Sequence, residues 1–168
     1  RDAALETGQV HLNETADGPT AKRMKANPNF QVIPVLPWAV QVLKFNMAQG
    51  AGADLNFRRA IAQAIDAEEI LGVAYPDIYK MDQSWVYAGS AYHTNRKPPK
   101  QDIVAAKATL AKSGYKGEKL TFIIDNIRPN IDAATVFQQQ MAQLGVNVEL
   151  KVADWPTTSG IGLKSDDG

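Results

Sequence analysis

The sequence of 168 residues is 45% hydrophobic and 21% charged, which suits a globular domain with a real core and argues against wholesale disorder. Eighteen basic and eighteen acidic side chains cancel without forming a long block of either sign, which argues against a nucleic-acid-binding protein or a polybasic membrane patch. Because the chain has no cysteine, disulfides, thiolate metal sites and cysteine nucleophiles are excluded.

The first residues predict only short elements. The chain opens at Arg1 without the layout of a signal peptide, so we expect an internal piece of a longer protein. Residues Ala4–Leu12 predict a short helix, a stop at Gly8 and a brief strand. Residues Pro19–Lys25 predict a second short helix after a turn.

Two β-type runs follow and predict a hairpin. They are Phe30–Leu36 and Val40–Phe45, joined by a turn that contains Trp38. An aromatic residue in such a turn can line a binding site or a lobe interface, although a place at the edge of the core is the default. Trp38 is therefore one candidate for a contact with a ligand.

The clearest helix has one apolar stripe and can begin at Asp54 or Asn56, both of which are good N-caps. After it, Ala74–Lys100 predicts a long excursion with little regular structure. Asp102–Ser113 predicts a further helix that ends at Gly114. The residues of the apolar stripe are Phe57, Ala60, Ile61, Ala64 and Ile65.

A strand, a helix and a second strand complete the pattern. Leu120–Asp125 is an apolar strand, and Val146–Val152 alternates apolar and polar residues as a half-buried strand does. The helix between them has Asn130 or Asp132 as its predicted N-cap and an apolar stripe of Ala133, Phe137, Met141 and Leu144. Residues 120–152 therefore predict a right-handed βαβ unit and an α/β fold.

The candidate site lies where these two strands end. In α/β sheets, ligands bind outside the carboxyl ends of parallel strands, here Asn126–Asn130 and Ala153–Thr157. Arg128 offers a permanently charged fork that suits a carboxylate, beside a helix N-terminus that also favours anions. Trp155 offers an aromatic wall with one donor. This combination suits a small organic acid or a peptide.

Both residues also have simpler interpretations. Arg128 can form a surface salt bridge with Asp125 or Asp132, which contributes about 0–1 kcal/mol. Trp155 can belong to the core or to an interface between domains. The spacing alone leaves these alternatives open.

Other kinds of site find little support. The two histidines, His11 and His93, lack partners at the spacing of metal ligands, so we expect no metal and no cofactor. Asp66, Glu68 and Glu69 cluster at the end of the amphipathic helix, and paired carboxylates can perform acid–base chemistry. An α/β hydrolase or transferase domain therefore remains the alternative function, and a purely structural interaction lobe the third.

The order of the segments resembles the extracytoplasmic solute-binding proteins of ABC importers, in particular the dipeptide/oligopeptide/nickel-binding family. The resemblance runs from about Ala4 to Trp155. It rests on ALETGQVHL, VLKFN, FRRAIAQAIDAEEIL, AAKATLAKSGYKG and VFQQQMAQLGVNVEL in that order.

This resemblance implies one lobe of a two-lobe periplasmic binding protein (type II), with a mixed β-sheet flanked by helices. The lobe would cover residues 1–156, and residues 157–168 would form a frayed tail. Implied partners are a peptide or small-molecule ligand, the missing first lobe and the transmembrane subunits of an ABC permease. The resemblance also implies a periplasmic or other extracytoplasmic location, with a signal peptide outside this chain. It implies neither enzyme activity nor a nucleic-acid partner.

Dipeptide-binding relatives carry an Arg-Pro-Tyr-Asn turn after the strand that corresponds to Leu120–Asp125, and its arginine holds the ligand carboxylate. This sequence has Arg128, Pro129 and Asn130 there, without the tyrosine. The resemblance therefore implies Arg128 as the main ligand-binding residue, and the missing tyrosine leaves the ligand open. The candidate ligand-binding residues are Arg128, Asn130, Asn126, Trp155 and Trp38.

Overall fold

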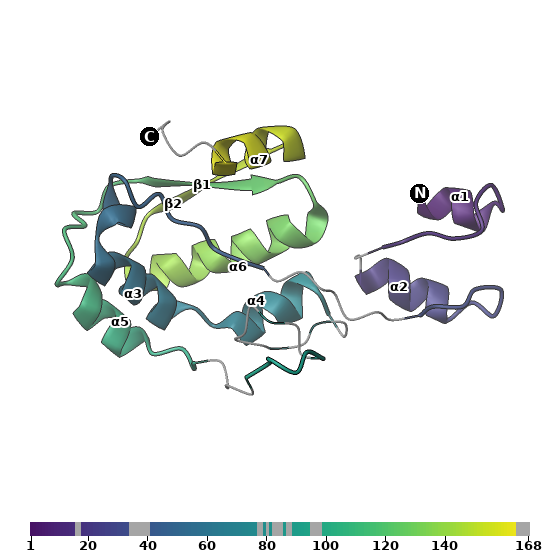
Figure 1. Ribbon diagram of the computed structural model, residues 1–168, viewed down its shortest axis with the longest axis horizontal. Helices are drawn as coiled ribbons and strands as arrows, with labels where there is room; N and C mark the ends of the chain where they lie inside the picture. The colour runs from purple at the N-terminus through teal and green to yellow at the C-terminus, as the bar shows by residue number, and fades with distance from the viewer. Residues whose placement is uncertain are drawn as a thin grey trace.

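The computed structural model describes residues 1–15, 18–33, 41–76, 79, 81, 86, 89–94 and 99–163. Figure 1 labels the helices and strands found in these residues, in chain order. They are α1 (Asp2–Glu6), α2 (Gly18–Lys25), the 3-10 helix η1 (Ala51–Ala53), α3 (Leu55–Ala64), α4 (Ala67–Ala74), α5 (Ile103–Leu110), β1 (Leu120–Asp125), α6 (Arg128–Leu144), β2 (Val148–Ala153) and α7 (Trp155–Leu163).

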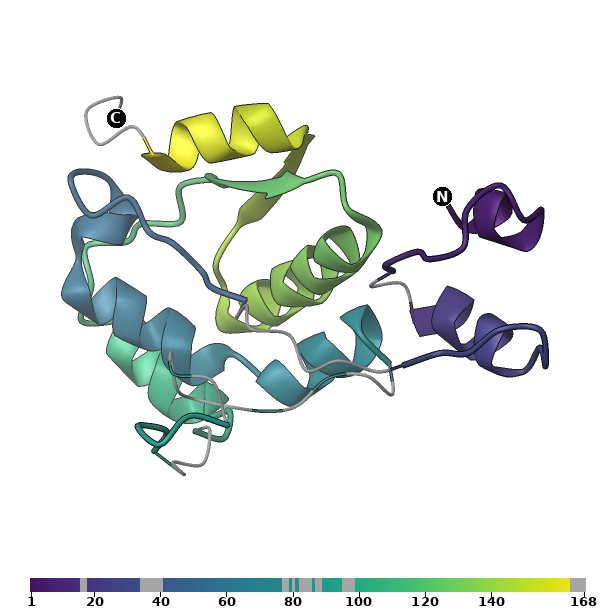
Figure 2. The ribbon, with the colours of Figure 1, turned by 45° about the vertical axis from the view of Figure 1, so that its right-hand side comes forward.

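Strands β1 and β2 pair in parallel, with a register that runs from Leu120 opposite Val148 to Asp125 opposite Ala153. The predicted strand–helix–strand unit is therefore confirmed, with α6 as the connection. Helix α6 packs on one side of the strands, and α7 lies on the other side, against β1 (Figures 1 and 2).

The predicted hairpin is not confirmed. Residues 30–33 and 41–46 are not in strands, and residues 34–40, which include Trp38, lie outside the described residues. Within the described part of the chain the sheet has two parallel strands, so its mixed character stays a prediction. Leu43 and Phe45 still pack against the core, because their alternate side chains face the same buried surface.

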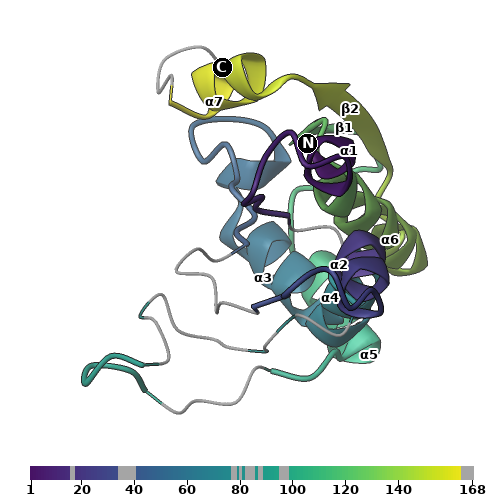
Figure 3. The same cartoon turned by 90° about the vertical axis from the view of Figure 1, so that its right-hand side faces the viewer.

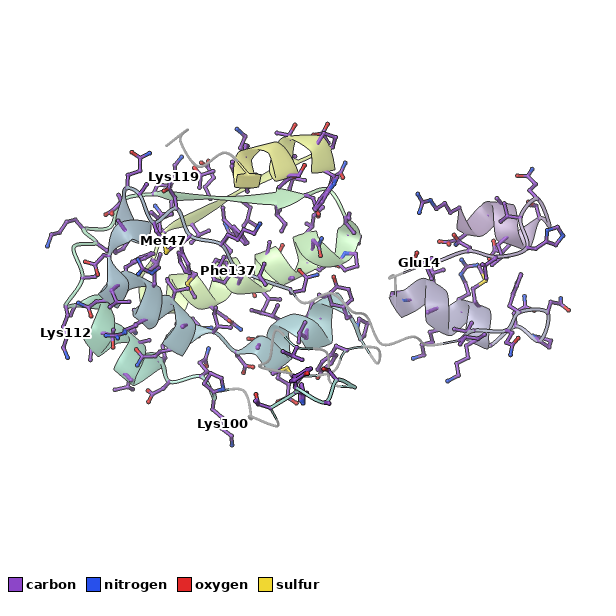
Figure 4. The ribbon with its side chains drawn as sticks, viewed as in Figure 1. Glu14, Met47, Lys100, Lys112, Lys119 and Phe137 are labelled. Atoms are coloured by element: carbon purple, nitrogen blue, oxygen red, sulfur yellow. The ribbon has the colours of Figure 1, made fainter. Side chains whose placement is uncertain are left out.

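The core lies between α3, α5, α6 and the strands. The predicted apolar stripe of α3 belongs to this core, where α3 packs against α5 and α6. Phe137 lies between α6 and the sheet, where its ring centroid is 5.1 Å from that of Phe122 (Figure 4). Such burial of aromatic and aliphatic side chains is the main stabilising contribution. The buried cluster consists of Phe57, Ala60, Ile61, Ala64, Ala106, Phe137, Met141, Leu144, Val146 and Val148.

Asp54 joins two segments at the start of α3. Its Oδ1 accepts hydrogen bonds from the N–H groups of Asn56 (2.7 Å) and Phe57 (3.1 Å), and its Oδ2 accepts one from Gly114 (2.9 Å). These hydrogen bonds hold the pKa of Asp54 below its ordinary value, and the bond from Gly114 has the largest effect. The predicted role of Gly114 as the stop of α5 is wrong, because α5 ends at Leu110 and the Gly114 backbone serves this cap instead.

Helices α1 and α2 lie beside the rest of the described chain rather than in its core (Figures 1 and 2). Glu6 and Arg23 form an ion pair between the two helices. Gly8 has a positive φ of 74° and ends the first helical segment as predicted, but the strand predicted after it does not form. The extent of the lobe, residues 1–156, stays a prediction.

The end of the described chain differs from the expectation. Residues 157–168 were predicted to fray, but the chain forms α7 up to Leu163, and residues 164–168 lie outside the described part. The Oδ1 of Asp154 accepts the N–H of Thr157 at 2.9 Å, as an N-cap does. The cap and the contact with β1 stabilise a helix whose own sequence, with two glycines, gives it little propensity.

The stretch after α4 has little regular structure where it is described, as predicted. Figure 3 shows residues 89–94 projecting away from the helices. Among all the residues described, no helix combines the length and the apolar composition needed to cross a bilayer.

Candidate ligand-binding edge of the sheet

The carboxyl ends of β1 and β2 lie side by side, because Asp125 and Ala153 are the last paired residues of the sheet. The turn from Asn126 to Arg128 leaves the first strand, and Asp154 and Trp155 leave the second. The two segments that the sequence predicted at this edge are therefore brought together.

Arg128 is the first residue of α6, and 78% of its side chain is exposed. Its Nε donates to both carboxylate oxygens of Asp132 at 2.9 Å, an ion pair between residues four apart on the helix. The predicted alternative, a surface salt bridge with Asp132, is thus present. The guanidinium also carries N–H groups on its two Nη atoms. A ligand role for Arg128 stays a prediction.

Helix α6 starts earlier than predicted. The N-cap is Ile127 rather than Asn130 or Asp132, because Pro129 favours the first turn of a helix and fixes its φ there. The first turn gives few backbone donors to an anion. Pro129 has no N–H, and the N–H groups of Asn130 and Ile131 donate to the Ile127 carbonyl at 3.0 and 3.1 Å. An anion at this edge would be held chiefly by the Arg128 side chain.

Asn130 is tied into the protein by its side-chain amide. Its Nδ2 donates to Asp125 at 2.8 Å, and its Oδ1 accepts from the Tyr75 hydroxyl at 3.0 Å and from Gln41 at 3.3 Å. The contacts of Tyr75 and Gln41 with Asn130 are not predictable from the sequence, since both residues lie far from Asn130 in the chain. Buried Asp125 does not pair with Arg128 in these bonds; it accepts from Asn130 and, at 3.4 Å, from the N–H of Ile127.

Two further candidates, Asn126 and Trp155, are exposed. Asn126 lies in the turn, and Trp155 is 63% exposed at the start of α7. Ile127 and Val152 are also about half exposed at the same edge. An exposed apolar surface next to a cation suits a ligand or a second lobe that covers it. Trp38 lies outside the described residues.

The carboxylate cluster that favoured an enzyme has structural roles. Asp66 caps α4 by accepting the N–H groups of Glu68 (3.0 Å) and Glu69 (3.1 Å), and Glu69 accepts a hydrogen bond from Gln140. In the described residues, no three His, Cys, Asp or Glu side chains are grouped so that they could hold a metal ion. Nothing at this cluster resembles a nucleophile with its base.

An apolar cleft lies at the opposite end of strand β1. An apolar cleft of about 240 Å³ opens between residues 43–52 and the start of β1, at the end of that strand opposite Arg128. Phe45, Phe122 and Phe137 line it. The exposed side chains of Arg128 and Trp155 make the other end of the strand an open surface, which agrees with one half of a site better than with an enzyme active site.

Comparisons with known proteins agree with this geometry. A curated relative from Sinorhizobium fredii, named "Probable peptide ABC transporter periplasmic-binding protein", is 26% identical over 162 residues, which are 91% of this chain and 30% of that protein. The substrate-binding protein CtaP of a Listeria monocytogenes ABC transporter superimposes with a TM-score of 0.73 at 28% identity, over 97% of this chain and 34% of that one.

A third similarity concerns the fold alone. The DppA protein of Helicobacter pylori, solved with a bound peptide, superimposes with a TM-score of 0.73 at 22% identity, over 93% of this chain and 31% of its own. This chain spans about a third of the length of the curated relatives that it matches. The family described as "Bacterial extracellular solute-binding proteins, family 5 Middle" matches residues 1–166, and the chain belongs to this family.

Proposed function

We propose that this chain is part of the substrate-binding component of an ABC importer, which captures peptides or related small carboxylate-bearing solutes and delivers them to a membrane permease. The family and the names of its relatives support this function. The observation that carries the ligand class is the position of Arg128, an exposed guanidinium on the carboxyl edge of the sheet.

Capture would work by charge pairing followed by enclosure. A guanidinium can bind a carboxylate through two parallel hydrogen bonds, and Arg128, whose side chain is 78% exposed, would bind the solute in this way. The exposed Trp155 and Ile127 would pack against apolar parts of the ligand. Because this edge is open, a second lobe that closes over it would supply the burial that strong binding needs.

The partners follow from this mechanism. They are a peptide or small-molecule ligand, the rest of the same polypeptide and the transmembrane subunits of an ABC permease. Such a protein works outside the cytoplasm, in the periplasm or on the outer side of the membrane. The alternative of an α/β enzyme domain has no support, since Asp66 and Glu69 serve as a helix cap and as a hydrogen-bond acceptor.

Recovery of a natural ligand tests the proposal. The intact polypeptide that carries this chain is purified from cells under mild conditions, and native mass spectrometry measures the mass of any bound molecule. We expect a carboxylate-bearing ligand in the wild type and in Arg59→Ala, a control that removes an exposed arginine from α3. Arg128→Ala should lose this ligand. An unchanged ligand load in Arg128→Ala would refute the role of Arg128.

A further inference from the structure

Four side chains form a hydrogen-bonded cluster beside the turn that presents Arg128. They come from the end of β1 (Asp125), the first turn of α6 (Asn130), the residue after α4 (Tyr75) and the segment before η1 (Gln41). Gln41 Nε2 donates to the Tyr75 hydroxyl at 2.9 Å and to Asn130 Oδ1 at 3.3 Å, and the Tyr75 hydroxyl donates to Asn130 Oδ1 at 3.0 Å. Three segments far apart in sequence therefore meet at one amide.

Asn130 has little capacity left for a ligand. An amide oxygen has two acceptor positions, and Tyr75 and Gln41 take both. One of the two Nδ2 hydrogens goes to Asp125, which is only 6% exposed. The side chain of Asn130 thus holds the protein together at this edge and is poorly suited to grip a solute.

The hydroxyl of Tyr75 is suited to hold this amide at neutral pH. Burial raises the pKa of Tyr75 above its ordinary value, the hydrogen bond from Gln41 lowers it, and the negative charge of Asp125 raises it further. The hydroxyl therefore keeps its proton and donates it to Asn130. A phenylalanine would fit the same space without this donor.

The cluster closes the turn on both sides of Arg128. Asp125 binds the backbone of Ile127 before it and the side chain of Asn130 after it. Tyr75 and Gln41 then fix Asn130 from outside the turn. A cation on a turn fixed in this way loses little conformational freedom when a ligand binds, and this raises the affinity.

We propose that Tyr75 and Gln41 are positioning residues, which hold Asn130 so that the β1–α6 turn presents the Arg128 guanidinium to the carboxylate of a solute. This inference rests on the proposed function, because it assigns these residues to the same site. They do not touch the ligand, and they act through the turn.

The test uses the intact polypeptide and two probe libraries, one of dipeptides to tetrapeptides with a free carboxyl terminus and one with the same peptides amidated. Mass spectrometry measures which peptides are retained and their dissociation constants. In Tyr75→Phe we expect affinity for the free acids to fall about fivefold to tenfold, of the order of one hydrogen bond. Preference for acid over amide should fall by the same factor. Gln41→Met should act in the same direction.

A double-mutant cycle separates positioning from general destabilisation. If Tyr75 acts through Arg128, Tyr75→Phe should change nothing further once Arg128→Ala is present. The control Tyr92→Phe, which removes a hydroxyl from a side chain that is 85% exposed, should keep the affinity and the preference of the wild type.

Each failure has its own meaning. If Arg128→Ala loses the free acids while Tyr75→Phe keeps the affinity and the preference of the wild type, the positioning role is refuted and the proposed function stands. Additive losses in the double mutant would refute action through Arg128. If the wild type retains neither library, or if Arg128→Ala retains the acids, the proposed ligand class or the role of Arg128 is refuted, and the positioning role with it.

Discussion

Replacing Gln140 by alanine should destabilise the protein strongly, although the preceding glutamine, Gln139, can be lost at little cost. Gln140 is 1% exposed on α6 and faces the junction of α3 and α4. Its Oε1 accepts the N–H of Asp66 at 3.0 Å, and its Nε2 donates to the carbonyl of Asp66 at 3.2 Å and to Glu69 at 2.6 Å. Alanine would remove all three bonds and leave both backbone groups of Asp66 without this partner.

The magnitude follows from the kind of each bond. A neutral hydrogen bond contributes about 0.5–1.5 kcal/mol, and one to a charged group about 1.5–3 kcal/mol. Two bonds to the Asp66 backbone and one to the Glu69 carboxylate therefore predict a loss of roughly 2.5–6 kcal/mol in the free energy of unfolding. Gln139 is exposed on the same helix, so Gln139→Ala should change the free energy of unfolding by no more than about 0.5 kcal/mol.

Urea unfolding of the intact polypeptide, followed by circular dichroism, compares the two variants with the wild type. The difference should lie in the transition midpoint at constant slope, since a changed slope would report another unfolded state. If Gln140→Ala costs no more than Gln139→Ala, the hydrogen bonds between α6 and the α3–α4 junction contribute no net stability, and the reasoning is wrong.

Three further predictions concern an ion pair and two helix caps. Arg128→Ala should cost about 0.3–0.5 kcal/mol in the free energy of unfolding, because its pair with Asp132 is an exposed pair within one helix; a loss above 2 kcal/mol would make Arg128 chiefly structural. Asp54→Asn should lower the melting temperature near neutral pH, and the difference from the wild type should vanish in acid. A carboxylate with a lowered pKa stabilises the folded protein at pH values above its ordinary pKa of 3.8, and this contribution is lost as the pH falls through the lowered pKa. A pH-independent difference would contradict this assignment. Asp154→Ala removes the acceptor for Thr157 and should increase hydrogen exchange in α7 while β1 stays protected; equal exchange would show that the cap is dispensable.

Patterns that depend on neighbouring residues were predictable from the sequence. The stripe of α3, its cap at Asp54 and the parallel pairing of the strands around α6 all follow from local periodicity and capping. The different environments of the three successive glutamines of α6 are not predictable in this way. Gln138 binds the carbonyl of Val148, Gln139 is exposed and Gln140 is buried, and only the packing of α6 against two different elements distinguishes them.

The candidate site was predictable as a place but not as a set of contacts. The carboxyl edge follows from the strand–helix–strand order, so Arg128, Asn126 and Trp155 were placed at one edge. The partners of Asn130 were not predictable, because Tyr75 and Gln41 reach it from segments that are 55 and 89 residues away. Helix α7 was missed for a similar reason, since its contact with β1 is tertiary.

The central claim is that Arg128 binds the carboxylate of a transported solute, and the dissociation constant of the co-purified ligand tests it most directly. Isothermal titration calorimetry on the ligand-stripped intact protein gives this constant for the wild type and for Arg128→Ala. The account predicts a rise of at least about thirtyfold, because removing one partner of a desolvated charge pair costs about 2–5 kcal/mol. A dissociation constant that stays within about twofold of the wild-type value would contradict it, since even a tenfold change corresponds to only about 1.4 kcal/mol.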